Sequence, residues 1–229
     1  MENTLYIGNY AYSSWSLRGW LLFEKFGIAA DLKPVDFNDT RSVADQMPDA
    51  APARTVPTLI TGDGAVIWDS LAMAEELASR YPDAGLWPAN PSQRALARSL
   101  AAEMHSGFSA LRSECPMNLL TAYSDSSPSD AVLADIDRLE TIWAYARTYT
   151  SGDTPWLCGD YSVADVFFAP VAARIAGYSL PVSDAAQAYV DAHLADAAFR
   201  KWRERGLESG QVLPWYAKPY PTKDWPDPR

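Results

Sequence analysis

The first quarter of the chain alternates short apolar runs with longer, helix-like patterns. Residues 4–7 form a β-prone run, and the serines within 13–16 follow it after a short loop. Serine hydroxyls cap the exposed N–H groups at a helix start, and Leu17 and Leu21 then repeat at i, i+4. Gly27 ends this pattern. The sequence therefore predicts a strand followed by a helix that begins at the serines.

The next segments complete a small mixed unit. Residues 31–37 predict a weaker strand, and a faint helix is indicated over 41–46. Two apolar runs within 58–68 are joined by an Asp-Gly pair at 63–64, which is a strong hairpin signal. A capped helix over 71–81 comes next. The predicted order is β-α-β-(α)-β-β-α.

A proline-rich segment separates this unit from the rest of the chain. Residues 82–91 hold three prolines and a glycine, a composition typical of a linker. The interpretation is an α/β domain over 1–82, a linker over 83–91 and an all-helical domain over 92–229.

The second half has helical periodicity throughout. Residues 92–120 predict one long helix that is broken or kinked near Pro116. Ser162 and Asp165 lie three residues apart before an apolar run and can cap a further, buried helix reciprocally. An apolar stripe at steps of 4, 3, 4 and 3 predicts the buried face of another helix: Val132, Ile136, Leu139, Trp143 and Ala146.

Composition and charge narrow the class of protein. The 229 residues are 48% hydrophobic and 21% charged, as expected of a folded, soluble protein. The net charge of −10 disfavours binding to nucleic acids and to anionic membranes. The longest apolar run, 166–173, is far too short to span a bilayer, and the N-terminus lacks the features of an export signal. A cytoplasmic location is therefore expected.

Cysteine and histidine spacing argues against several kinds of site. Cys115 and Cys158 form no C-x-x-C motif, and His105 and His193 are far apart in the sequence. These spacings disfavour a disulfide framework, thiol-disulfide chemistry and a zinc site, so no metal is expected. Gly8 lacks the further glycines of a dinucleotide-binding loop.

Four motifs occur in an order that resembles the cytosolic glutathione S-transferases along nearly the whole chain. They are YSSWSLR at 12–18, VPTL at 56–59, DS at 69–70 and GDYSVAD at 159–165. The serine-rich stretch is most similar to the serine-type zeta class, which includes maleylacetoacetate isomerases, and to some uncharacterised bacterial members. The resemblance implies a thioredoxin-like N-terminal domain (βαβ-ββα) that binds glutathione, an all-helical C-terminal domain and a homodimer.

The resemblance implies that Ser13 or Ser14 is the catalytic residue, and the sequence does not choose between them. A hydroxyl at a helix N-terminus can donate a hydrogen bond to a bound thiolate. Half ionisation at pH 7 of a thiol with a pKa of about 8.5 requires roughly 2 kcal/mol. One hydrogen bond to a charged acceptor contributes about 1.5–3 kcal/mol, which is enough.

The same resemblance implies the residues that bind glutathione. Ser70 and the helix start behind it suit the γ-glutamyl carboxylate, and Arg54 is either a contact for the glycyl carboxylate or an ordinary solvated side chain. Asp69 either contacts the amino group of the tripeptide or only caps its helix, because the family usually has a longer Glu or Gln there. A cis bond before Pro57 would turn the backbone of Val56 outward, toward an extended peptide. The expected glutathione-binding set is Trp15, Arg54, Thr55, Val56, Asp69 and Ser70.

The second substrate is expected to be a small electrophile, as in detoxification, in a pocket bordered by His105, Phe108 and Arg112. These residues share one face of the long predicted helix, although His105 also fits an ordinary interhelical histidine. Two other functions stay open. A glutathione-dependent isomerase of a dicarboxylate would need cations, for which Arg112 and Arg174 are candidates, and a non-catalytic module of the same fold would bind glutathione without activating it.

Overall fold

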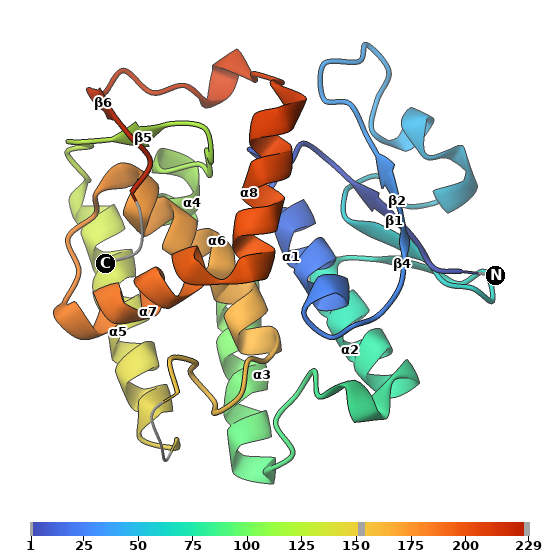
Figure 1. Cartoon of the computed structure of the whole chain (residues 1–229), viewed down its shortest axis with the longest axis horizontal. Coiled ribbons are helices and arrows are strands. Elements are labelled where there is room, and N and C mark those ends of the chain that lie inside the picture. Colours follow the sequence, from blue (N-terminus) through green and yellow to red (C-terminus); the bar gives the residue numbers. More distant parts are fainter. Residues whose placement is uncertain (1, 151–153, 227–229) are drawn as a thin grey trace.

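The computed structural model describes residues 2–150 and 154–226, and in it a mixed α/β half packs against a helical half (Figure 1). The elements of the first half are β1 (Thr4–Ile7), α1 (Ser14–Glu24), β2 (Asp31–Pro34), β3 (Thr58–Ile60), β4 (Val66–Trp68) and α2 (Ser70–Arg80).

The strands form a mixed sheet in the order β2-β1-β3-β4. β1 pairs with β2 in parallel and with β3 antiparallel, and β3 pairs with β4 antiparallel through the predicted hairpin. This is the expected thioredoxin-like arrangement. The faint helix expected over 41–46 is instead a short 3₁₀ turn, Ala44–Gln46, followed by another at Pro48–Ala50.

The second half is helical apart from a short ribbon that ties down the C-terminal segment. Its elements are α3 (Pro91–Ser106), α4 (Ser109–Glu114), β5 (Ala122–Tyr123), α5 (Asp130–Arg147), α6 (Val163–Tyr178), α7 (Asp184–Ala195), α8 (Ala197–Ser209) and β6 (Thr222–Lys223). β5 and β6 pair antiparallel, so residues 222–223 return to the segment that follows α4. A 3₁₀ turn at Pro214–Tyr216 precedes β6.

The long predicted helix ends just before Pro116, as expected, but it is also broken earlier, at residues 107–108. The second piece, α4, ends at Glu114 in front of Pro116, and the unpredicted break lies between the end of α3 at Ser106 and the start of α4 at Ser109. Phe108 adopts a left-handed backbone with φ of 58°, which an α-helix cannot continue through. A Cβ at Gly107 would lie 2.8 Å from the carbonyl oxygen of Glu103, so a side chain there would disturb the turn.

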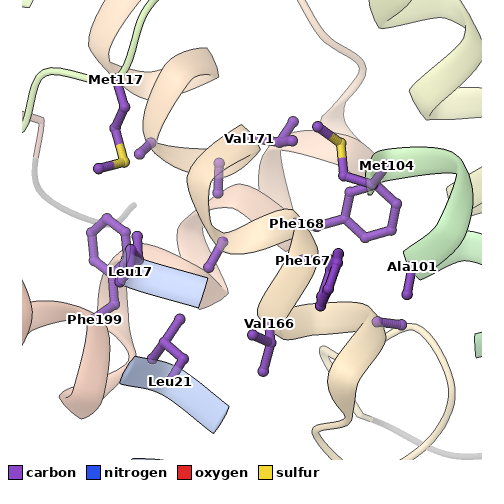
Figure 2. Packing of buried hydrophobic residues seen from close by; sticks show 14 of the residues in the cluster. Leu17, Leu21, Ala101, Met104, Met117, Val166, Phe167, Phe168, Val171 and Phe199 are labelled. Atoms are coloured by element: carbon purple, nitrogen blue, oxygen red, sulfur yellow. The ribbon is translucent and has the colours of Figure 1, made fainter. Parts of the chain in front are cut away.

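Helix α6 lies at the centre of the molecule, and each of its residues is buried. Figure 2 shows side chains of α1, α3, α6 and α8 meeting in one hydrophobic cluster. The labelled members from these helices are Leu17, Leu21, Ala101, Met104, Val166, Phe167, Phe168, Val171 and Phe199. Because α1 belongs to the first half and the others to the second, the two halves share a core.

The start of α6 is fixed by the capping pair that the sequence predicts. Asp165 is fully buried and accepts hydrogen bonds from the Ser162 N–H (2.9 Å) and hydroxyl (3.2 Å). It also accepts from the Leu157 N–H (3.1 Å) and the Tyr189 hydroxyl (2.8 Å). Burial raises the pKa of Asp165, and these donors offset part of that effect. The pair is structural.

Stability is expected to fall in mild acid because of His193. This side chain is 1% exposed, its ring lies 4.6 Å from that of Tyr189 and 5.2 Å from that of Trp156, and its pKa is lowered from 6.5 to about 3, chiefly by burial and secondarily by Lys25. The unfolded chain binds a proton here below pH 6.5 while the folded chain does not, so the free energy of unfolding decreases as the pH falls. The loss from this residue at about pH 5 is about 2 kcal/mol.

Urea unfolding at about pH 7.5 and about pH 5 measures this contribution. The variant His193→Phe should lose about 2 kcal/mol less between the two conditions than the wild-type chain. Equal losses in both proteins would show that His193 titrates normally in the fold.

Among residues 2–150 and 154–226, no helix combines the length and the apolar character needed to cross a membrane.

Candidate functional site

A cavity of about 600 Å³ lies between the two halves of the molecule. One wall comes from the loop before α1, the start of α1, the approach to β3 and the start of α2. The other wall comes from α4, the loop after it, α6 and the 3₁₀ turn at Pro214–Tyr216. The expected residues that line it are Ser13, Ser14, Trp15, Arg54, Thr55, Val56, Asp69, Ser70 and Arg112.

The Ser13 hydroxyl makes its hydrogen bonds within α1, the helix that it caps. Its oxygen accepts a hydrogen bond from the N–H of Ser16 (3.2 Å), and its proton is donated to the Ser16 hydroxyl oxygen (2.8 Å). The Ser16 oxygen also accepts from the N–H of Gly8 at 2.8 Å, which ties α1 to β1. Ser13 therefore has its proton committed within the protein.

The Ser14 hydroxyl accepts a hydrogen bond but, unlike that of Ser13, donates none to a described residue. Ser14 is the first residue of α1, and its hydroxyl oxygen accepts a hydrogen bond from Nη2 of Arg174 at 3.2 Å. Within the described part of the chain its own O–H has no acceptor. With Arg174 on one side of the oxygen, the proton of Ser14 is free for a ligand in the cavity.

Arg174 is held firmly on the buried helix α6. It is 4% exposed, and it also donates from Nε to the carbonyl of Cys115 (3.0 Å) and from Nη1 to the carbonyl of Pro170 (3.1 Å). Burial lowers its pKa to about 10, so the guanidinium remains charged at neutral pH. Ser14 therefore has a fixed positive charge beside it.

Two more arginines enclose the ring of Trp15. The guanidinium carbon of Arg112 lies 4.3 Å from the ring centroid and that of Arg18 lies 4.8 Å from it. Arg112 lines the cavity, whereas Arg18 is 2% exposed, and its Nε and Nη1 have no partner among the described residues. Burial lowers the pKa of both guanidinium groups. The site is locally positive although the chain carries a net charge of −10.

The start of α2 presents a second set of polar groups to the cavity. The Asp69 carboxylate caps α2 by accepting from the N–H of Leu71 at 2.8 Å. The Ser70 hydroxyl is buried and has no partner among the described residues. A free hydroxyl beside the N–H groups of a helix start suits a carboxylate. Asp69 also meets Nε2 of His105, at 2.9 Å from its Oδ2.

The approach to β3 forms the remaining wall. The Val56–Pro57 peptide is cis, and Val56, Thr55 and Arg54 all line the cavity. Arg54 is exposed, so its guanidinium is available at the rim.

Comparisons with known proteins agree with this arrangement. The family described as "Glutathione S-transferase, N-terminal domain" matches residues 12–80. A probable maleylacetoacetate isomerase from Caenorhabditis elegans is 28% identical over 184 residues, which are 75% of this chain and 81% of that protein.

Solved structures share the fold. A glutathione transferase homolog from Burkholderia, crystallised with bound glutathione, is 24% identical with a TM-score of 0.66, covering 91% of this chain and 100% of that one. Glutathione transferase Omega 2S from Trametes versicolor is 22% identical with a TM-score of 0.66, covering 94% and 99%. Residues 12–80 therefore form a glutathione S-transferase N-terminal domain, and the matches support the glutathione S-transferase superfamily for this chain.

Two residues expected in the second-substrate pocket, Phe108 and His105, do not line the cavity. Phe108 is 6% exposed and packs in the hydrophobic core, because its left-handed backbone ends α3 and interrupts the predicted helical face. His105 is turned toward Asp69 and the Trp15 ring, whose centroid is 5.3 Å from its own. Of the three predicted residues, only Arg112 lies in the wall.

Several lining residues were not singled out by the sequence. The rings of Tyr12 and Tyr216 are tilted toward each other with their centroids 4.9 Å apart, so the C-terminal segment covers one side of the cavity. The C-terminal segment is rich in Trp, Tyr and Pro, which indicates that it packs against the rest of the protein. This composition does not predict which part of the surface it covers. Arg174 was named as a candidate cation, but its contact with Ser14 was not foreseen.

Neither cysteine side chain is a reactive nucleophile. Burial raises the pKa of Cys115 to about 11 and of Cys158 to about 12, so both are protonated at neutral pH. Across the described ranges, no group of three or more His, Cys, Asp or Glu side chains is placed to hold a metal ion.

Proposed function

We propose that this protein binds glutathione between its two halves and that Ser14 stabilises the thiolate for attack on a small electrophile. The observation that supports this most directly is the contact between Arg174 and Ser14, which leaves the Ser14 proton free toward the cavity. Ser13 lacks this freedom because its proton is bound by Ser16.

The proposed binding mode uses the polar groups in order along the cavity wall. Ser70 and the N–H groups of α2 receive the γ-glutamyl carboxylate, Asp69 receives the amino group, and Arg54 meets the glycyl carboxylate. The sulfur then lies toward the start of α1. A hydrogen bond from Ser14 together with the charge of Arg174 supplies the roughly 2 kcal/mol needed for half ionisation of a thiol at pH 7.

In the proposed reaction the thiolate attacks an electrophilic carbon. A carbon–sulfur bond forms from the sulfur lone pair, and the leaving group departs with the electron pair of its own bond. The protein contributes ionisation of the thiol and proximity. If the substrate has no leaving group, the thiolate adds reversibly to a conjugated double bond of the substrate.

A second candidate function, a glutathione-dependent cis-trans isomerase, is supported by the charge of the cavity. Arg112 and Arg174 both line it, so it suits an anionic substrate such as a dicarboxylate. Addition of the thiolate to the double bond permits rotation, and loss of the thiolate restores the bond in the other geometry. The relative named as a probable maleylacetoacetate isomerase is consistent with this candidate.

The two candidates are distinguished by Arg112→Gln, because Arg112 lies in the wall but its hydrogen bonds go to the carbonyls of Met104 and His105 and not to Ser14. If the natural substrate is a dicarboxylate such as maleylacetoacetate, kcat/KM for it should fall about tenfold while kcat/KM for a neutral aryl halide changes less than about twofold. Equal effects on both substrates would argue against an anionic electrophile. Glutathione binding measured by calorimetry is the first control, and binding without any turnover would identify a non-catalytic module.

On the resemblance to the superfamily we also propose a cytoplasmic homodimer. Light scattering during size-exclusion chromatography tests the oligomeric state.

A further inference from the structure

His105 joins the two halves of the molecule at the site. It lies on α3 in the helical half, and its Nε2 is 2.9 Å from Oδ2 of Asp69 at the start of α2 in the mixed α/β half. Asp69 lines the cavity, whereas His105 does not. Any effect of His105 on a ligand in the cavity is therefore indirect.

The Asp69 carboxylate is fixed at both oxygens. Oδ1 accepts the N–H of Leu71, and Oδ2 meets His105. The backbone of Asp69 has φ of 126°, a conformation that side chains rarely adopt, so its position is set by the surrounding structure. The side chain remains 45% exposed and lines the cavity, which leaves part of the carboxylate open to a ligand.

His105 supports the carboxylate as a neutral donor. Its Nδ1 is buried and has no partner in the described structure, so a proton there would be unpaired. Burial, Arg18 and Arg112 lower its pKa, and they outweigh the opposing effect of Asp69. The neutral tautomer with its proton on Nε2 donates to Asp69. A neutral donor orients the carboxylate without cancelling its negative charge.

The ring of His105 is itself held in place. Its centroid lies 5.3 Å from that of Trp15 and 6.1 Å from that of Phe167, and Nη1 of Arg112 donates to its carbonyl oxygen at 3.1 Å. The donor therefore comes from a packed element and not from a loose side chain.

We propose that His105 is a positioning residue that holds the Asp69 carboxylate toward the α-amino group of the γ-glutamyl arm. This inference rests on the proposed function, because it assumes that glutathione is the ligand. An oriented carboxylate that retains its full charge selects a cation, and the amino group is the cationic part of the tripeptide. The helical half thereby takes part in recognising glutathione as well as the electrophile.

The test compares two ligands and three variants by calorimetry. The ligands are glutathione and γ-deamino-glutathione (glutaryl-cysteinyl-glycine), which lacks only the amino group. His105→Leu and His105→Asn remove a donor from the position of Nε2, and His105→Gln keeps one there. In His105→Leu and His105→Asn the Kd for glutathione should rise about fivefold to tenfold, and the Kd for the deamino ligand should stay within about twofold of wild type. His105→Gln should bind both ligands as wild type does.

Other outcomes overturn the inference in recognisable ways. If His105→Leu and His105→Asn raised the Kd of both ligands equally, His105 would only pack between the two halves of the molecule. Weak binding of glutathione by His105→Gln would mean that the donor is not what matters. If the wild-type chain bound no glutathione, the proposed function would fail first. Urea unfolding of each variant shows whether it is folded, and if His105→Leu is not, the His105→Asn variant decides.

Discussion

Replacement of Ser14 by alanine is expected to lower kcat/KM of the proposed glutathione-dependent reaction by about 100-fold. Of the two serines at the start of α1 that line the cavity, Ser14 is the one whose hydroxyl proton is left for a ligand, since Arg174 occupies its oxygen and no described group accepts its O–H. Loss of that donor removes a hydrogen bond that is strongest when the sulfur is charged.

Replacement of Ser13 by alanine is the matched control. Ser13 caps α1, so its loss should lower the free energy of unfolding by about 1 kcal/mol. The activity of the folded variant should stay within about fivefold of wild type, since the hydroxyl proton of Ser13 is held by Ser16. Steady-state kinetics and urea unfolding of both variants measure these effects. The reverse pattern, with Ser13→Ala inactive and Ser14→Ala active, would assign the chemistry to Ser13.

Replacement of Asp165 by alanine should give the largest loss of stability, about 3–5 kcal/mol. The carboxylate is fully buried and accepts from four donors, which belong to Leu157, Ser162 and Tyr189. Without the carboxylate these buried donors have no acceptor, and the start of the central helix α6 is no longer fixed. Urea unfolding followed by circular dichroism measures the change.

Asp165→Asn and Ser162→Ala serve as comparisons. Asparagine keeps one oxygen acceptor and should cost less than alanine, and Ser162→Ala removes one hydroxyl donor and should cost about 1 kcal/mol. A loss below about 1 kcal/mol for Asp165→Ala would contradict the role of this capping pair.

The sheet was largely predictable because its signals are local. An Asp-Gly pair at 63–64 between apolar runs predicts the hairpin, and the structure places β3 and β4 on either side of it. Ser13 caps α1 as the serine-rich start implied. Each of these features depends on residues within one or two turns of each other.

The break between α3 and α4 was not predicted because its cause is not local. Proline is the residue that most clearly interrupts a helix, and α4 does end at Glu114, just before Pro116. The earlier break depends on a left-handed Phe108, which is seldom signalled by sequence since bulky residues rarely adopt that conformation. Packing of Phe108 into the core accompanies this conformation.

The site was predictable in its residue types but not in its pairings. Ser13 and Ser14 are adjacent and chemically identical, so only their partners distinguish them. The partner of Ser14 is Arg174, 160 residues away along the chain, and the partner of Asp69 is His105 on another helix. Both pairings depend on how the two halves pack, which helical periodicity does not encode.

The central claim, that Ser14 lowers the pKa of bound glutathione, is tested most directly by titrating the ultraviolet absorbance of the thiolate. With wild type and with Ser13→Ala, the bound thiol should titrate about 1.5 pH units below the free thiol. With Ser14→Ala at saturating glutathione, the midpoint should return toward that of the free thiol. A bound thiol that titrates like the free one in the wild-type protein, or an unchanged midpoint in Ser14→Ala, would contradict the account.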